Sequence, residues 1–456
     1  MVYGQNITDA SSFGFLPDAS GIENTKALQQ AADQTGTIRI TTPGTYRIAG
    51  TVYIGSHTSL VFENGVILQK VNEQGIFTHV LLNKGALTKT YDEHISIEGL
   101  TIAVNGIDKG FTEIYGLRGQ IAFFYVKDLR IAHFRCEDLE SALFCVHVCT
   151  FEDLIIDDVI IKGKKDGIHL GCGKRFTIRN CVFRTFDDGI ALNAHDYATS
   201  NPEMGWIEDG VVENCYDLNA EKTTGFFCRI LAGSWIDWKQ GMEVQHSDAV
   251  VSNGRIYRVQ AEPNGKIYQS QTRPVHESGI EVLDSIRWGV VQNEITYTAG
   301  VRNVSFRNIF LYKPRIGFSF NFDKGRYSRS YYPGAVVPLQ KQFIFENIRV
   351  LHDSPVDLIS INTPVDVITI IASSFAENGI RFHGEALPGY ETTKLNLLGC
   401  VFNKQGVMTL INSNVEHKKI VLKTTASIEM QAGFSAKVIE GKGQITVNSD
   451  LTGLTK

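Results

Sequence analysis

Several residue types and patterns that mark particular protein classes are scarce or missing. Cysteine and proline account for only 8 and 11 of the 456 residues, so the chain is neither a disulfide-stapled scaffold nor a proline-rich linker. No Cys-x-x-Cys pair occurs, which argues against a structural zinc site, and we expect the thiols to be free and buried. No apolar run approaches the roughly 20 residues that cross a bilayer, so no membrane span is predicted.

The chain also lacks a large excess of positive or negative charge. Lys and Arg total 44 against 49 Asp and Glu, and without a basic face no nucleic-acid partner is expected. With 43% hydrophobic residues the chain is too apolar to be disordered. No phosphate loop or dinucleotide fingerprint occurs, so no cofactor is predicted. The start of the chain lacks an apolar segment, which leaves either a cytosolic protein or a mature form of an exported one.

What the chain does contain is a repeat. Short strands recur in the pattern apolar-x-apolar-x-Asn/Gly/Asp-x-apolar, which is typical of a strand, a bend and a second strand. An Asn or Gly at the bend tolerates the left-handed backbone conformation that such a turn needs. Copies lie at 95–102, 128–134, 153–161, 175–183, 210–215, 249–257, 303–311, 343–351, 367–375 and 394–402.

The repeat is most regular at 145–149, 167–171 and 189–193, which follow one another at a constant offset. The second and fourth residues of each segment are aliphatic, so pleating puts them on one face in two stacked columns. A fixed period with stacked aliphatic columns indicates an all-β parallel β-helix, in which each coil buries its face against its neighbours. A β-sandwich with accidental register is the alternative.

We predict one β-helix domain over residues 1–456. It comprises an N-terminal cap at 1–50, coils at 51–414 and a C-terminal cap at 415–456, with long loops leaving the coils at about 195–340. The cap includes a helix at 25–33, with Asn24 as its N-cap, because alanine and leucine recur there at helical spacing. Such a helix would cover the open first coil, whose apolar surface and unpaired strand edges are otherwise exposed.

The same constant offset aligns Asp166 with Asp188, and Asp187 is the neighbour of Asp188. Adjacent coils are about 4.8 Å apart, so the three carboxylates repel one another and at least one pKa should rise. Unequally protonated carboxyls suit acid–base chemistry on a glycosidic bond. The alternative is that Asp-Gly is only turn chemistry. Alternation places Asp166 and Asp188 on the inward side, and we expect the following glycines to bend both carboxylates outward, because burial is costly.

Further polar and aromatic residues are candidates for substrate binding. His169, in one column with His147, and His195 are expected at outward positions, although a surface histidine is often inert. A tryptophan face stacks on sugars and arginine binds planar anions, although these side chains equally pack loops or remain solvated. A metal cluster of His and Asp has no diagnostic spacing, so no metal site is predicted. The predicted substrate-binding residues are His169, His195, Arg229, Trp238, Lys239, Arg287 and Arg326, the last in the basic and aromatic loop 324–332.

Residues 18–350 resemble the polygalacturonase-type glycoside hydrolases. The likeness is carried by 18–21 (DASG), 24–29 (NTKALQ), Lys165-Asp166-Gly167 in place of Asn-Thr-Asp-Gly, and above all 186–192 (FDDGIAL). It implies a single-stranded, right-handed parallel β-helix and a secreted or periplasmic protein. It also implies Asp187 as the general acid, with Asp166 and Asp188 activating water and inversion at the anomeric carbon. The family's Gly-His-Gly and Arg-Ile-Lys elements are absent, the nearest stretches being 225–229 and 255–257.

The function expected from these residues is hydrolysis of an acidic or galactose-type polysaccharide by a monomer. An inverting mechanism predicts carboxyl groups about 6.5–9.5 Å apart, with room for a water molecule. One alternative is a polysaccharide lyase or epimerase, in which the acidic cluster binds Ca²⁺ and an Arg or Lys abstracts a proton. The other is a non-catalytic, tailspike-like β-helix that binds carbohydrate.

Overall fold

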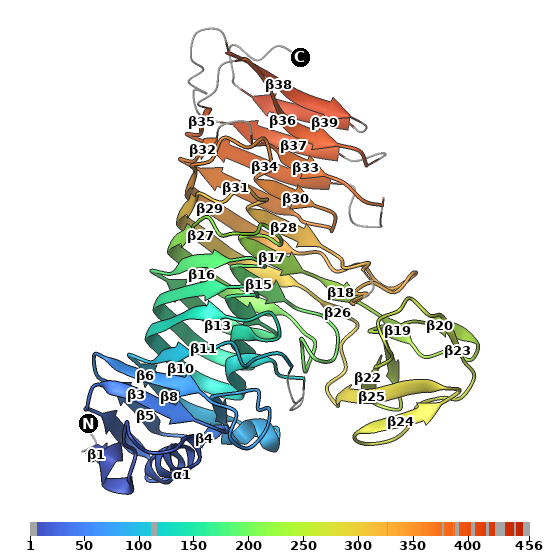
Figure 1. Ribbon diagram of the computed structural model, residues 1–456. Helices are drawn as coiled ribbons and strands as arrows, with labels where there is room; N and C mark the ends of the chain where they lie inside the picture. Colours follow the sequence, from blue (N-terminus) through green and yellow to red (C-terminus); the bar gives the residue numbers. More distant parts are fainter. Residues whose placement is uncertain are drawn as a thin grey trace, which may run out of the picture. The chain divides into compact units, whose positions relative to one another are not determined.

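The computed structural model describes residues 7–110, 116–325, 327–375, 378–385, 387, 392–402, 406–415, 419–424, 434–441 and 444–449. These form two compact units, Met1–Ala191 with Gly210–Thr224, and Leu192–Asp209 with Gly225–Lys456. The prediction of one domain over 1–456 stays a prediction. Within each unit, most strands lie parallel and stack coil on coil (Figure 1). The all-β prediction is confirmed, and the described residues contain one α-helix.

The first unit is built from short parallel strands with two long ones in its middle. Its helical elements are η1 (Ala10–Phe13), α1 (Gly21–Ala32) and η2 (Lys84–Leu87). Its strands are β1 (Ile7–Asp9), β2 (Gly36–Ile40), β3 (Gly44–Ile48), β4 (Val52–Ile54), β5 (Thr58–Phe62), β6 (Val66–Lys70), β7 (Leu81–Asn83), β8 (Asp92–Glu98), β9 (Thr101–Ala103), β10 (Gly119–Leu139), β11 (Phe144–Gly163), β12 (Ile168–Leu170), β13 (Gly173–Arg179) and β14 (Val182–Thr185). Strands β15 (Ile190–Asn193) and β16 (Ile207–Asp217) contribute residues to both units.

The second unit contains further coils and a set of small sheets. Its coil strands are β17 (Cys228–Leu231), β27 (Val301–Leu311), β28 (Phe318–Asn321), β29 (Lys341–Val350), β30 (Ile359–Ile361), β31 (Val367–Ile371), β32 (Ser374–Phe375), β33 (Ile380–Phe382), β34 (Thr392–Leu398), β35 (Val401–Phe402), β36 (Gly406–Ser413), β37 (Lys419–Thr424), β38 (Phe434–Gly441) and β39 (Gln444–Ser449). Of the C-terminal cap predicted at 415–456, the described strands β37 to β39 continue the parallel pairing, and the remainder lies outside the described residues.

The predicted stacking of successive coils is confirmed. Val146 of β11 pairs with Ile168 of β12, and the amide of Ile168 donates to the carbonyl of Gly189 on the next coil at 3.0 Å. Val146, Ile168 and Ile190 are fully buried, as stacked inward columns should be. The repeated aliphatic positions therefore form the core of the first unit and set which residues of successive coils lie side by side.

The asparagine bends are confirmed as well. Asn180, Asn214, Asn308 and Asn347 all have positive φ, between 52° and 57°. Within the first unit the side-chain amide of Asn214 donates to Asn180 Oδ1 at 3.2 Å, and within the second that of Asn347 donates to Asn308 Oδ1 at 2.7 Å. At each of these bends a left-handed asparagine turns the chain, and its side chain also bonds to the matching asparagine of a neighbouring coil.

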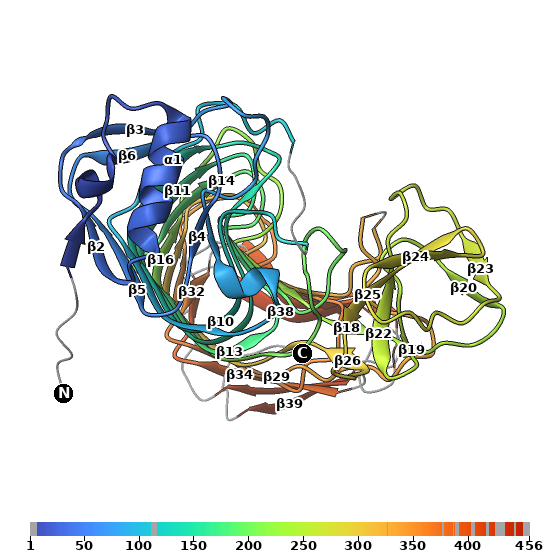
Figure 2. The ribbon, with the colours of Figure 1, turned by 90° about the horizontal axis from the view of Figure 1, so that it is seen from below.

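The helix α1 begins earlier than predicted, at Gly21. The N-cap is Ser20, not Asn24, because Ser20 and Glu23 form a capping box that satisfies two backbone amides. Asn24 is instead buried inside the helix, and its side-chain amide bonds to both backbone groups of Leu16. As predicted, α1 lies across the opening of the first coil, against β3 and β4 (Figure 2).

The repeat predicts a coil at 249–257, but this segment does not form one. It forms an antiparallel hairpin of β21 (Ala249–Ser252) and β22 (Arg255–Val259). Asn253 and Gly254 both have positive φ, at 45° and 76°, and two such residues in a row reverse the chain. The hairpin belongs to a five-stranded sheet with its own core around Trp288.

Short strands surround this hairpin in the second unit. The five-stranded sheet adds β19 (Ile236–Asp237), β24 (Ile280–Leu283) and β25 (Ile286–Gln292) to β21 and β22. Two small ribbons pair β18 (Gly233–Ser234) with β26 (Thr298–Ala299) and β20 (Met242–Val244) with β23 (Tyr268–Ser270). Part of the region predicted as long loops at about 195–340 is therefore folded sheet.

All eight cysteines are free thiols. Seven are buried and Cys172 is half-buried, which agrees with the expectation of buried thiols for all but Cys172.

Candidate active site

Asp166, Asp187 and Asp188 come together on adjacent coils of the first unit. Asp166 lies between β11 and β12, and the other two lie between β14 and β15. The amide of Gly167 donates to the carbonyl of Asp188 at 2.9 Å, which fixes the two segments side by side. One carboxylate oxygen from each of the three residues lies within 4.8 Å of one from each of the others. The predicted meeting of the three carboxylates is confirmed, and the separation of carboxyl groups that an inverting mechanism needs stays a prediction.

The bend between the coils is tight enough to require glycine. A Cβ at Gly167 would lie 2.6 Å from the carbonyl oxygen of Gly189 and 2.9 Å from the ring of Phe183. Asp166 and Asp188 on either side of these bends are only 4% and 3% exposed, so both carboxylates are largely covered, whereas the sequence predicted that they avoid burial.

Lys165 supplies a positive charge inside this cluster. Its ammonium forms an ion pair with Asp187 Oδ2 and lies 3.4 Å from Asp166 Oδ1 and 5.6 Å from the centre of the Phe144 ring. Two unit charges 4.8 Å apart interact by about 3 kcal/mol at an effective dielectric constant of about 20. Repulsion among three carboxylates is therefore large, and one ammonium offsets it in part. Sequence reasoning did not predict Lys165 as a site residue. It noted Lys165 only because the lysine departs from the Asn-Thr-Asp-Gly motif of the polygalacturonase-type hydrolases.

The carboxyl group of Asp187 differs from that of Asp166 in exposure. Its side chain is 30% exposed, whereas that of Asp166 is 6% exposed. The pKa of Asp187 is raised, first by burial and then by the charge of Asp166, against the opposing effect of Lys165. A partly exposed carboxyl with a raised pKa, beside other carboxylates, is suited to donate a proton to a bound molecule.

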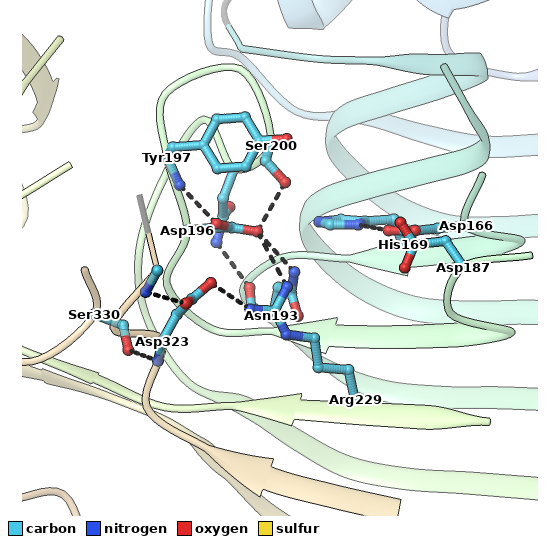
Figure 3. A network of polar contacts seen from close by, with 12 residues as sticks. Asp166, His169, Asp187, Asn193, Asp196, Tyr197, Ser200, Arg229, Asp323 and Ser330 are labelled. Carbon is cyan, nitrogen blue, oxygen red and sulfur yellow. Dashed lines mark hydrogen bonds and ion pairs between the residues drawn. The ribbon is translucent and has the colours of Figure 1, made fainter. Parts of the chain in front are cut away.

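His169 contacts Asp166. The predicted column of His147 and His169 is confirmed by the strand register, and both rings are fully buried. His169 Nδ1 is 3.0 Å from Asp166 Oδ2, as Figure 3 shows, and the ring stacks on Phe144 at 4.1 Å. Burial holds the pKa of His147 well below its usual range. The substrate-binding role of His169 stays a prediction, and its contacts are those of a residue that orients Asp166.

The second unit contains a different carboxylate network, centred on Asp196 (Figure 3). Asp196 Oδ2 accepts hydrogen bonds from Asn193 Nδ2 at 2.8 Å and Ser200 Oγ at 2.9 Å, and Oδ1 accepts from the Tyr197 amide at 2.9 Å. The predicted residue Arg229 lies beside it, 4.0 Å from Asp196 Oδ2.

Arg229 makes its closest contact with another carboxylate of the same unit. Its guanidinium donates to Asp323 Oδ2 at 2.7 Å, and the other Asp323 oxygen accepts from the amide of Gly325 at 2.8 Å. The amide of Asp323 donates in turn to Ser330 Oγ at 2.8 Å. Arg229 therefore connects the Asp196 network to the start of the predicted basic and aromatic loop.

Two predicted substrate-binding residues are packed inside the second unit. His195 is 1% exposed and lies against Gly233, where an added Cβ would be 2.4 Å from His195 Cβ. Burial lowers the pKa of His195 to about 3, so the ring is neutral. Trp238 is 8% exposed, its indole nitrogen donates to Ser270 Oγ at 2.8 Å, and Arg273 lies over the ring at 4.9 Å. These contacts are those of a packing tryptophan.

The remaining predicted residues are basic. Lys239 and Arg287 are exposed in the second unit, and Arg326 lies outside the described residues. The loop that contains Arg326 is anchored by Arg329, 3.2 Å from Asp248 Oδ2, and by the hydroxyl of Tyr332, which donates to the carbonyl of Glu243 at 2.9 Å. The structure thus brings Asp166, Asp187, Asp188 and His169 together in the first unit, and the other predicted residues that it describes belong to the second.

Among the described residues, the three aspartates form the one group with a spacing that suits a metal ion. Oxygens up to 4.8 Å apart can share a Ca²⁺ ion, whose bonds to oxygen are about 2.3–2.6 Å long. The ammonium of Lys165 already contacts two of the three, so a cation belonging to the chain itself is present in the cluster.

Comparison with known proteins finds likeness in structure alone. No family model and no curated protein matches the sequence. The A-module of mannuronan C-5 epimerase AlgE4 from Azotobacter vinelandii superposes with a TM-score of 0.56 at 10% identity, over 98% of this chain and 100% of that one. The family 28 exopolygalacturonase of Yersinia enterocolitica gives 0.50 at 12% identity, over 98% and 79%. The tailspike of E. coli bacteriophage HK620, in complex with a pentasaccharide, gives 0.48 at 11% identity, over 94% and 75%.

The chain has the right-handed parallel β-helix fold of these solved structures. The predicted handedness and the resemblance in fold are thereby confirmed, whereas the low identity leaves the individual reaction undecided. In the part of the chain that the structure describes, no helix has the length and apolar character needed to cross a membrane.

Proposed function

We propose that this β-helix hydrolyses glycosidic bonds of a polysaccharide and that Asp187 is its general acid. The observation that carries the proposal is the three-carboxylate cluster, in which Asp187 is the partly exposed member and has a raised pKa. The mannuronan epimerase and the exopolygalacturonase are named for acting on polysaccharides, which supports a polysaccharide substrate.

In this proposal the three carboxyl groups have different catalytic roles. Asp187 donates its proton to the leaving glycosidic oxygen, while Asp166 and Asp188 accept hydrogen bonds from the attacking water. The resemblance implies inversion, and retention is the alternative. NMR of the anomer first released from a substrate distinguishes the two, and we expect inversion.

We further propose an acidic or galactose-type glycan as the substrate. The exposed side chains of Lys239 and Arg287 and the half-buried Arg229 suit carboxylate or sulfate groups, which guanidinium binds through paired hydrogen bonds. The predicted roles of His195, Trp238 and Arg326 in binding belong to the same proposal. We expect the enzyme to act outside the cytoplasm, as a monomer and without a metal or organic cofactor.

The test is a polysaccharide screen that follows reducing ends and ultraviolet absorbance together. Wild type should release reducing ends without an absorbing product, and Asp187→Asn should not. Asp158→Asn is the matched control, because Asp158 is a bend residue of the same unit that pairs with Arg135 and lies outside the cluster. Full activity of Asp187→Asn on the true substrate would contradict the assignment.

Two other outcomes would replace hydrolysis with a rival function. An absorbing, unsaturated product or an epimerised polymer would indicate lyase or epimerase chemistry, and retention of oligosaccharide without turnover would indicate a binding protein. A lyase needs a neutral base, and His169 and Lys165 are two basic side chains in contact with the cluster. The nitrogen of Lys165 contacts two carboxylates as an ammonium, which has no lone pair to accept a proton. This contact favours hydrolysis over a reaction with Lys165 as the base.

A further inference from the structure

Lys165 and its neighbour Lys164 differ sharply in their surroundings. Lys164 is 48% exposed and pairs with Glu140, at 2.9 and 2.8 Å from the two carboxylate oxygens. Lys165 is 21% exposed, and its ammonium reaches Asp187 and Asp166. Two adjacent lysines of one turn thus provide a surface ion pair and a cation inside the acidic cluster.

The cluster needs positive charge because two of its members are almost buried. Asp166 and Asp188 are 4% and 3% exposed, and an ionised carboxylate away from water is stable only when it is paired or hydrogen-bonded. His169 bonds to one oxygen of Asp166, and the ammonium of Lys165 faces the other. The same ammonium bonds to Asp187, so it links the two coils.

We propose that Lys165 is a built-in counter-ion, which takes the place that a divalent cation would occupy among Asp166, Asp187 and Asp188. The inference concerns the same site as the proposed function and rests on it for its bearing on catalysis, where Lys165 is a positioning residue. It follows that removing the ammonium turns the cluster into a Ca²⁺ site, because Asp166 and Asp187 lose this cation while oxygens of the three carboxylates stay within 4.8 Å of one another.

The ammonium of Lys165 also lies near an aromatic ring. The centre of the Phe144 ring lies 5.6 Å from the ammonium, and the same ring stacks on His169, which bonds to Asp166. Phe144 is 1% exposed at the start of β11, so its position is set by the core. The ammonium is therefore held by contacts from two coils rather than by a flexible surface pair.

The experiment compares Lys165→Met, Lys165→Arg and the matched control Lys164→Met by thermal unfolding, with EDTA and with millimolar CaCl₂. In EDTA we expect Lys165→Met to unfold at a lower temperature than Lys164→Met. CaCl₂ should then raise its Tm by about 2–5 °C, because an ion that binds only the folded state stabilises it. Wild type, Lys164→Met and Lys165→Arg should not respond to Ca²⁺. Isothermal titration with CaCl₂ should give binding to Lys165→Met alone.

The proposal is overturned if Lys165→Met shows the same Tm as Lys164→Met and no response to Ca²⁺. It is equally overturned if wild type gains as much from Ca²⁺ as the variant, since the cluster would then take a metal beside Lys165. Neither measurement uses a substrate. A failure of the counter-ion role is therefore distinguishable from a failure of the proposed hydrolysis, which only the polysaccharide screen tests.

Discussion

The acidic cluster of the first unit and the Asp196 network of the second bury carboxylates in opposite ways. Asp196 is 1% exposed and accepts hydrogen bonds from two side chains and one amide. A buried guanidinium, that of Arg258, donates to its backbone carbonyl at 2.7 Å. In the acidic cluster, three carboxylates lie close together, and one ammonium contacts two of them. The carboxylate of Asp196 is surrounded by hydrogen-bond donors, whereas those of the acidic cluster are surrounded by one another.

The difference separates a structural carboxylate from a candidate catalytic one. A saturated carboxylate stabilises the loop that surrounds it, and removing its charge costs stability. A carboxylate among like charges carries a free-energy cost that folding alone does not explain, and such costs concentrate at functional sites. The two regions should therefore respond in opposite ways to the same substitution of aspartate by asparagine.

The largest expected effect is on activity in the acidic cluster. Asp187→Asn should lower kcat by at least about 10²-fold, because an amide cannot donate the catalytic proton. It should change the unfolding temperature little, because the repulsion from Asp166 and the ion pair with Lys165 disappear together. Initial rates of reducing-end release and thermal unfolding measure the two effects. A marked loss of stability together with retained activity would reverse the comparison.

The next effect is on stability in the Asp196 network. Asp196→Asn should lower the free energy of unfolding by about 2–3 kcal/mol, because an amide nitrogen then faces donors that need an acceptor. Urea unfolding measures this, and Asp353→Asn, at an exposed position of the same unit, should change it by less than about 0.5 kcal/mol. Equal stability of Asp196→Asn and Asp353→Asn would show that the network is not structural.

A pH profile sharpens the contrast further. Since the pKa of Asp187 is raised, this residue stays protonated above the ordinary range of aspartate, and kcat/KM should fall about tenfold per pH unit beyond that raised pKa. The contribution of Asp187 to the free energy of unfolding also falls as pH rises. Folding favours the protonated form, so this contribution is present below the unfolded-state pKa and is lost as pH rises through the folded-state value. A rate that instead rises over this range would exclude Asp187 as the acid.

The smallest expected effect is common to both units. Asn180→Ala in the first and Asn308→Ala in the second should each cost about 1 kcal/mol of unfolding free energy, because alanine is strained at positive φ. The matched glycine variants at the same positions should lose less, since glycine adopts that conformation freely. Urea unfolding of the four variants measures the difference, and no gain of glycine over alanine would show that the bends tolerate any residue.

Much of the coil architecture was accessible from the sequence, because it depends on neighbours along or directly across strands. The constant offset between coils, the inward aliphatic columns and the left-handed asparagines were all predicted and found. The errors in the helix cap and in the segment 249–257 came from local chemistry. Ser20, in a capping box with Glu23, is the helix N-cap instead of Asn24. At 249–257 the pair Asn253-Gly254 reverses the chain into a hairpin, whereas a single asparagine would only have bent the strand.

The sequence by itself determined that the chain forms β-helical coils and that Asp166, Asp187 and Asp188 meet, because both follow from a repeat that places residues one coil apart. Only the tertiary structure decided that Asp166 and Asp188 stay buried, that His169 is covered and contacts Asp166, and that Lys165 joins the cluster. Side-chain direction at a corner depends on the backbone angles of the bend and on the packing of two coils. Neither of these has a signature in the residue order.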